Sequence, residues 1–94
     1  MAEHNLHISY DLYSPGQKYD AIKKVLERLG VPAKVHYSFW YLKSPYTPKE
    51  VGEAIWSVMD QNDSLYVVDA ATNVAYWFNV NDFTEQRIQR NWNQ

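Results

Sequence analysis

Cysteine is absent from this chain of 94 residues. Disulfide bonds, thiolate metal sites and cysteine nucleophiles are therefore excluded. Glycine is scarce, with three residues, and Pro15-Gly16 is typical of a turn, so the chain has no glycine-rich loop for binding phosphate. No apolar run approaches the roughly 20 residues that a membrane helix needs, and the first residues do not resemble a signal peptide. We therefore expect a soluble, cytoplasmic protein without membrane contact.

A positive net charge is lacking too, since the formal charge is −2. The charge is uneven: residues 17–49 hold seven basic and two acidic side chains, and residues 50–94 hold seven acidic and two basic ones. Bulk charge therefore does not attract nucleic acid, although a basic face on the first helix and the strand after it would. The alternative is an ordinary solvated helix face. The candidate nucleic-acid contacts are Lys23, Lys24, Arg28 and Lys34.

Aromatic residues, in contrast, make up 16% of the chain, with four Trp, eight Tyr and three Phe. A domain of this size buries only about two-thirds of its unfolded surface, so one small core has little room for so many rings. We interpret the excess as a surface for self-association, and the alternative is an aromatic core whose ring edges meet water. The predicted interface residues are Tyr37, Phe39, Tyr41, Tyr76, Trp77 and Phe78.

Hydrophobic periodicity predicts alternating strands and helices. Leu6, Ile8 and Tyr10 alternate with polar residues, which predicts a strand with one apolar side. The segment Ala33–Leu42 is expected to be extended and covered on both faces, and a bend near Tyr37-Ser38 would split it into two strands. The expected elements are a strand over His4–Leu12, a helix from Ser14 to Leu29, this extended segment, a helix from the capping box Thr47–Glu50 to Asp60, strands over Leu65–Ala70 and Val74–Phe78, and a short helix over Asp82–Arg90.

This order predicts an α+β fold, because the strands cannot all be parallel. Both long helices are expected on one face of the sheet, as in a ferredoxin-like plait (βαββαβ), here with an added C-terminal strand and a short tail helix. Residues 1–78 would form the domain and residues 79–94 the tail. His7, Ser9 and Asp11 are expected on the bare sheet face. A second copy on that face would bury the aromatics, which predicts a homodimer.

Three segments in this order of elements resemble the CRISPR-associated protein two superfamily. They are Tyr10-Asp11 at the end of the first strand, His36–Trp40 and Asp63–Val68. Tyr10-Asp11-Leu12, Pro15-Gly16 and Tyr19, with Ser38 two residues before Trp40, are closer to the SinR-like and VapD-like relatives. The resemblance spans residues 5–78. It implies a ferredoxin-like homodimer that is a metal-dependent nuclease, an RNA-cleaving toxin or a non-catalytic scaffold holding nucleic acid or partner proteins.

Asp11 is the candidate catalytic and metal-binding residue, because a carboxylate at the end of a strand can bind a cation or accept a proton. The acidic residue implied by the resemblance falls on Asp11 alone, and two copies of it across a twofold axis would share one Mg²⁺. The alternative is an Asp that caps the following turn. His4, His7 and His36 together could form a transition-metal site or supply a general base, but they lack the spacing of a metal site, and the alternative is ordinary surface or interface histidines. Ser9 and Ser38 have no visible base.

Two classes of function therefore remain open at the level of sequence. A non-catalytic homodimeric module that binds protein or nucleic acid is favoured by the single carboxylate and the lack of positive charge. The alternative is a Mg²⁺-dependent endonuclease or toxin-like endoribonuclease that uses Asp11. One fold hosts many functions, so the fold alone does not choose between them.

Overall fold

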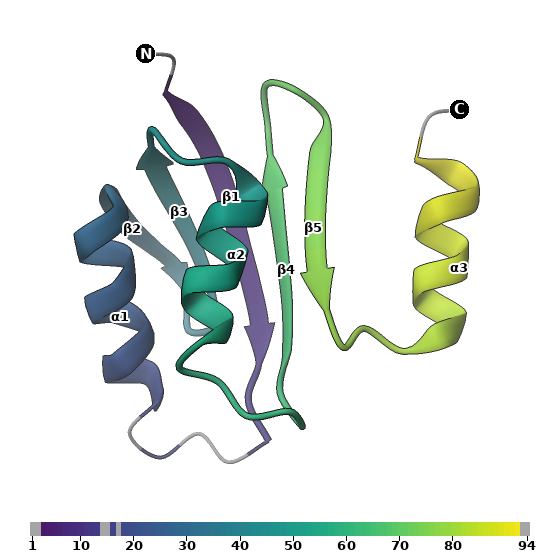
Figure 1. Ribbon diagram of the computed structural model, residues 1–94, viewed down its shortest axis with the longest axis horizontal. Helices are drawn as coiled ribbons and strands as arrows, with labels where there is room; N and C mark the ends of the chain where they lie inside the picture. The colour runs from purple at the N-terminus through teal and green to yellow at the C-terminus, as the bar shows by residue number, and fades with distance from the viewer. Residues whose placement is uncertain (1–2, 14–15, 17, 93–94) are drawn as a thin grey trace.

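The structure is a computed structural model that describes residues 3–13, 16 and 18–92. In Figure 1, α1 and α2 lie on one face of the sheet, and α3 lies beyond the last strand. The elements in chain order are β1 (His4–Asp11), α1 (Lys18–Leu29), β2 (Val31–His36), β3 (Phe39–Ser44), α2 (Pro48–Trp56), β4 (Ser64–Asp69), β5 (Val74–Phe78) and α3 (Asp82–Asn91).

The five strands form one antiparallel sheet in the order β2-β3-β1-β4-β5. The predicted α+β class is confirmed. β1 occupies the centre, and its alternating pattern decides the two faces of the sheet. Leu6, Ile8 and Tyr10 are buried under the helices, whereas His7 and the other intervening residues are exposed on the opposite side. We call that opposite side the open face.

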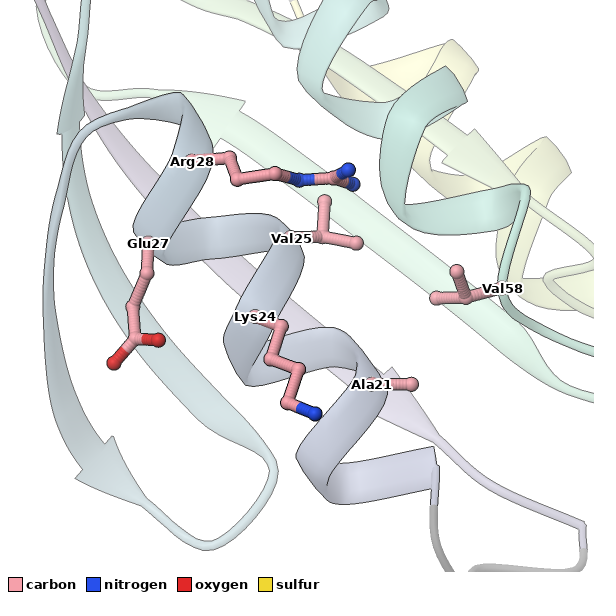
Figure 2. Close-up of a pocket in the computed structure, with 6 residues that line it drawn as sticks. All are labelled: Ala21, Lys24, Val25, Glu27, Arg28 and Val58. Atoms are coloured by element: carbon pink, nitrogen blue, oxygen red, sulfur yellow. The ribbon is translucent and has the colours of Figure 1, made fainter.

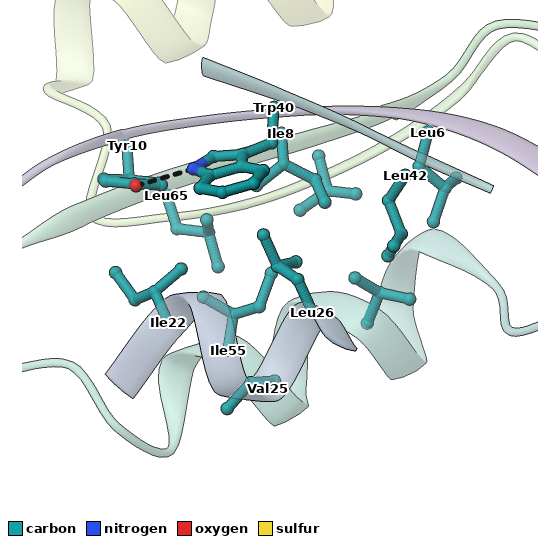
Figure 3. Close-up of a cluster of buried hydrophobic side chains, with 12 residues drawn as sticks. Leu6, Ile8, Tyr10, Ile22, Val25, Leu26, Trp40, Leu42, Ile55 and Leu65 are labelled. Carbon is teal, nitrogen blue, oxygen red and sulfur yellow. Dashed lines mark hydrogen bonds between the residues drawn. The ribbon is translucent and has the colours of Figure 1, made fainter. Parts of the chain in front are cut away.

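The core lies between the sheet and the α1/α2 layer, and each helix contributes one apolar stripe. Ile22, Val25 and Leu26 of α1 are buried, as are Val51 and Ile55 of α2. In Figure 3, Ile22, Leu26 and Ile55 point from the helices toward side chains of the sheet, namely Leu6, Ile8 and Leu42. One polar contact lies within this core: Trp40 Nε1 donates a hydrogen bond to the Tyr10 hydroxyl over 2.9 Å.

Several predicted boundaries differ from the structure, among them those of the strand predicted over Leu65–Ala70, which runs Ser64–Asp69, and the end of the tail helix, which is Asn91 rather than Arg90. The segment Ala33–Leu42 is not one strand but parts of β2 and β3, joined by a tight turn at Tyr37-Ser38, as the alternative prediction had it. Its side away from the helices is exposed or half-exposed in the single chain, because both helices lie on the other face. The first strand ends at Asp11 rather than Leu12.

The second helix ends at Trp56, earlier than the predicted Asp60. Its predicted start is confirmed, since Thr47 and Glu50 form a reciprocal capping box. The start of the first helix was expected at Ser14-Pro15, which lies outside the described residues; α1 is described from Lys18.

Candidate functional surface

The open face carries a mixture of polar and aromatic side chains. Residues paired directly across neighbouring strands point to the same side of a sheet, so the register assigns each position. His7 lies between Tyr41 and Val68, Ser9 lies between Phe39 and Tyr66, and Trp77 pairs with Tyr66. Phe39, Tyr41, Tyr66, Val68 and Trp77 are half-buried, and the positions of β1 between them are exposed.

Neighbouring side chains hold these rings in place. The rings of Tyr66 and Trp77 stack with centroids 5.7 Å apart, and His7 lies 6.0 Å from Phe39. The Tyr41 hydroxyl donates a hydrogen bond to Asn5 Oδ1 over 2.6 Å. The open face is therefore an ordered surface of amphipathic rings around a polar central strand, a composition that is typical of protein interfaces.

The six predicted interface residues divide among three locations. Phe39, Tyr41 and Trp77 lie on the open face. Tyr76 and Phe78 lie on the helix side, where their rings lie near the backbone of Gly52, and Phe78 stacks on Trp56 with centroids 4.8 Å apart.

Tyr37 lies neither on the open face nor on the helix side of the sheet. It occupies the turn between β2 and β3 and is 65% exposed. Its ring packs on Tyr19 with centroids 4.5 Å apart, and the Lys34 ammonium lies 4.5 Å from the ring centroid. The structure therefore gathers half of the predicted aromatic set on one surface.

Asp11 lies on the open face at the end of β1, where it is exposed and paired with Ser64. Among the described residues its side chain makes no hydrogen bond or ion pair. Described strand positions on this face hold no second carboxylate, and residues 3–13, 16 and 18–92 contain no cluster of three or more metal-ligating side chains. Mg²⁺ requires oxygen ligands in octahedral geometry, and the described strand positions of one chain offer it a single carboxylate on this face.

The three histidines are not brought together. His7 and His36 both lie beside the Phe39 ring, at 6.0 and 6.2 Å between centroids. His4 lies on the helix side, where its Nδ1 is 2.5 Å from the buried carboxylate of Asp69. A transition-metal site formed by all three is therefore not supported by their positions.

Two carboxylates, Asp63 and Asp69, are fully buried, and the sequence pattern does not predict either of them. The Asp63 carboxylate accepts hydrogen bonds from the backbone N–H groups of Tyr13 and Asp60, both over 2.7 Å. It also forms an ion pair with Lys18, whose Nζ lies 2.8 Å from it. Burial acts to raise the pKa of Asp63, but the bonds from Lys18 and the two N–H groups outweigh it and hold the pKa below its ordinary value. The hydrogen bonds that Lys18 donates to the carboxylates of Asp60 and Asp63 raise the pKa of Lys18 above its ordinary value.

Asp69 has a similar environment at the other end of β4. Its carboxylate accepts bonds from the Ala71 N–H, from the Thr72 hydroxyl and from His4. Burial acts to raise its pKa, and these bonds together lower it below the ordinary value. Both carboxylates have all their partners within the fold, so we assign them structural roles. Only Asp-containing turns could have indicated them, and that signal is common.

The predicted basic residues lie on the helix side of the sheet, away from Asp11. Lys24 and Arg28 line a groove between α1 and the segment after α2, and Figure 2 shows both side chains with Val25 and Val58. Lys23 is exposed on the same helix. Lys34 belongs to β2, and its ammonium lies 6.0 Å from the centroid of the Trp40 ring on the helix side of the sheet. The sheet therefore separates the basic residues on α1 from the Asp11 carboxylate.

The described residues contain no helix that is long and apolar enough to cross a membrane. Comparisons with protein-family models, curated proteins and solved structures found no match to this chain.

Proposed function

We propose that this protein is a homodimeric, non-catalytic binding module built on a ferredoxin-like plait, similar to the CRISPR-associated protein two superfamily and its SinR-like and VapD-like relatives. The strand order β2-β3-β1-β4, with α1 and α2 on one face, supports the plait, and β5 is then the added strand. The proposal places the protein in the cytoplasm. The observation that carries it is the aromatic open face, which none of the helices formed by the described residues covers in Figure 1.

The β2 edge of the sheet is poorly suited to pairing with a second chain, and α3 lies beside the β5 edge. On β2, Pro32 has no N–H donor, Lys34 adds a charge, and the register shifts between Lys34 and His36. These features protect edge strands from pairing. Beyond β5 the chain continues into α3, and Glu85 of that helix accepts a hydrogen bond from Trp77 Nε1 over 2.6 Å. Self-association is therefore expected through the open face rather than through an edge.

The size of the open face decides how much of it a dimer must use. Five strands about 4.8 Å apart, each with about six residues rising 3.3 Å, span roughly 24 by 20 Å in projection. The relief of the side chains increases the accessible area above this plane. The projected area is about 480 Å², and a standard interface buries about 800 Å² on each partner, so a dimer would have to engage the whole open face together with the relief of its side chains.

The test adds a charge at the centre of the open face without removing any packed side chain. Ser9 is exposed between Phe39 and Tyr66, so Ser9→Arg leaves the fold of one chain intact. Ser57→Arg is the matched control, because Ser57 is also exposed but follows α2 on the helix side. Sedimentation velocity is expected to find a dimer for the parent and for Ser57→Arg. The dissociation constant of Ser9→Arg should rise by about tenfold or more.

A monomeric parent, or a dimer that Ser9→Arg does not weaken, would contradict the proposal. Circular dichroism of each variant checks that the secondary structure is retained.

The nuclease alternative is supported by one observation, the exposed Asp11 carboxylate, which makes no hydrogen bond within the described residues. Its test is cleavage of single-stranded RNA and double-stranded DNA with Mg²⁺ or Mn²⁺; activity lost in a folded Asp11→Asn dimer would replace the non-catalytic assignment.

A further inference from the structure

The helix layer carries a groove on the side of the molecule opposite the open face. The groove is shallow and open to solvent, has a volume of about 550 Å³ and runs along α1 beside the segment that follows α2. In Figure 2, Ala21, Val25 and Val58 form its apolar floor, whereas the Glu27 side chain points away from α2. Its full lining is Ala21, Lys24, Val25, Glu27, Arg28 and Val58.

Two cations border this floor without an anionic partner. Neither Lys24 nor Arg28 forms a salt bridge or a side-chain hydrogen bond within residues 3–13, 16 and 18–92, and both are exposed. They are spaced i, i+4 on α1, so they lie on the same side of the helix. The groove therefore combines a strip of apolar surface with two free positive charges along it.

We infer that this groove binds an acidic amphipathic segment of a partner protein. Apolar residues of the segment would pack on Val25 and Val58, and its carboxylates would pair with Lys24 and Arg28. This is the mode in which an amphipathic helix lies in a groove, here selected by charge complementarity. The inference rests on the proposed function only in taking the protein as a binding module.

The lining favours a protein segment over nucleic acid. Nucleic-acid sites neutralise many phosphates, typically about six to ten in a specific complex, and offer polar contacts to the backbone. This groove offers two cations and an apolar floor, in a chain of net charge −2. A dimer formed through the open face would leave one such groove free on each protomer, because the helix layer lies on the other side of the sheet.

The experiment selects ligands without assuming their sequence. Random peptides of about 16 residues, long enough for about four helical turns, are displayed on phage and selected on the full-length parent. The enriched peptides are expected to be acidic, with apolar residues at helical spacing. Labelled copies are then titrated by fluorescence polarisation against the parent, Lys24→Glu/Arg28→Glu and Lys23→Glu. Lys23 lies on the same helix but does not line the groove, so it is the matched control.

Affinity is expected to fall by about tenfold or more in the double variant, as for loss of paired interfacial charges, and to change little in Lys23→Glu. A scrambled peptide with the same charge but no apolar face should bind weakly. The inference is overturned by an absence of enrichment, by enriched peptides without negative charge, or by an equal effect of Lys23→Glu. Tighter binding of single-stranded RNA with the same dependence on Lys24 and Arg28 would assign the groove to nucleic acid instead.

The outcome is independent of the test of the dimer. Ser9 and the groove lie on opposite sides of the sheet, so a monomeric Ser9→Arg variant is expected to bind the selected peptide as the parent does. Loss of dimerisation with retained peptide binding would leave this inference standing and overturn only the self-association. Retained dimerisation without peptide binding would overturn the inference about the groove and leave the proposed self-association standing.

Discussion

At the scale of single residues, Asp63 links two segments that are far apart in the sequence. Its carboxylate binds the N–H of Tyr13, which follows β1, and the N–H of Asp60, which follows α2. Lys18, at the start of α1 as described, is the third partner of the Asp63 carboxylate and also forms an ion pair with Asp60. Because Asp63 is fully buried, its hydrogen bonds are sheltered from water, and the fold depends on its negative charge.

Asp63→Asn is expected to lower the free energy of unfolding at neutral pH by about 2 kcal/mol, because hydrogen bonds to a buried charge are lost. Asp60→Asn is the control: its carboxylate contacts the same Lys18 but is 59% exposed, so the loss should stay below about 0.5 kcal/mol. Urea denaturation measures both. Equal losses in the two variants would mean that burial of Asp63 does not decide its contribution.

The pH dependence of the same variants follows from the lowered pKa values of Asp63 and Asp69. A carboxyl group whose folded pKa lies below its unfolded value, about 3.9, stabilises the fold fully above that value. The contribution is lost as the pH falls through the lower, folded pKa. The parent should therefore lose stability below about pH 4. Asp63→Asn should lose less over that interval, and Asp60→Asn should follow the parent.

Sequence reasoning could place Asp11 but not Asp63 or Asp69. The alternation of β1 is local, so it assigns Asp11 to the side of His7 and Ser9 before any tertiary contact is known. The environment of Asp63 depends on Tyr13 and Lys18, which are 50 and 45 residues away in the chain. His4 and Asp69 are 65 residues apart. Such contacts exist only once the sheet is assembled, and local patterns carry no information about them.

At the scale of elements, two glycines contribute for different reasons. Gly30 follows α1, and a Cβ there would lie 1.9 Å from the carbonyl oxygen of Lys43 in β3. Gly52 lies within α2, and a Cβ there would lie 3.4 Å from the Tyr76 ring and 3.6 Å from the Phe78 ring. The first position has no room for a side chain, whereas the second makes ordinary contacts with a methyl group.

Gly30→Ala is therefore expected to destabilise the protein by about 1–3 kcal/mol, because the backbone of α1 or β3 must move. Gly52→Ala should stabilise it by up to about 1 kcal/mol, since alanine has the higher helix propensity and the methyl group fits. Thermal unfolding followed by circular dichroism compares the two with the parent. A destabilised Gly52→Ala would show that the rings of Tyr76 and Phe78 cannot yield to the methyl group.

The elements with local start signals were the most predictable. The capping box at Thr47 specifies the start of α2 through bonds within four residues, and the structure contains it. The end of that helix was misplaced because the apolar pattern continues through Val58 and Met59. Their N–H groups bond to Ile55 and Trp56, three residues back, so the chain tightens into a 3₁₀-type turn there. Periodicity alone does not distinguish this turn from another α-helical one.

At the scale of the whole molecule, the sheet separates two surfaces of different chemistry. The open face carries Phe39, Tyr41, Tyr66 and Trp77 around a polar central strand, and the helix layer carries the groove with Lys24 and Arg28. A nuclease would need its carboxylate and its phosphate contacts on the same side. The separation therefore favours a module with one surface for self-association and another for a partner.

The third helix is the element least integrated into this molecule. None of its residues is buried, and Phe83 is 68% exposed. Hydrogen bonds from Trp77 to Glu85 and from Trp92 to the Asn73 carbonyl link this part of the chain to the sheet. β1, in contrast, is paired on both sides, with β3 and β4. Elements with few buried contacts open at low free energy, whereas central strands open only with the whole fold.

Amide hydrogen exchange on the intact protein is expected to reveal this difference directly. Protection of the α3 amides should be lower than that of the β1 amides by about a hundredfold or more, because α3 can open without exposing any core residue. The exchange is followed by mass spectrometry at a protein concentration low enough to dissociate the proposed dimer and at one high enough to form it. Equal protection of α3 and β1 at the low concentration would contradict the weak attachment of this helix. Protection of α3 that rises only at the high concentration would instead indicate that α3 is held by a second protomer, because none of its residues is fully buried in the single chain.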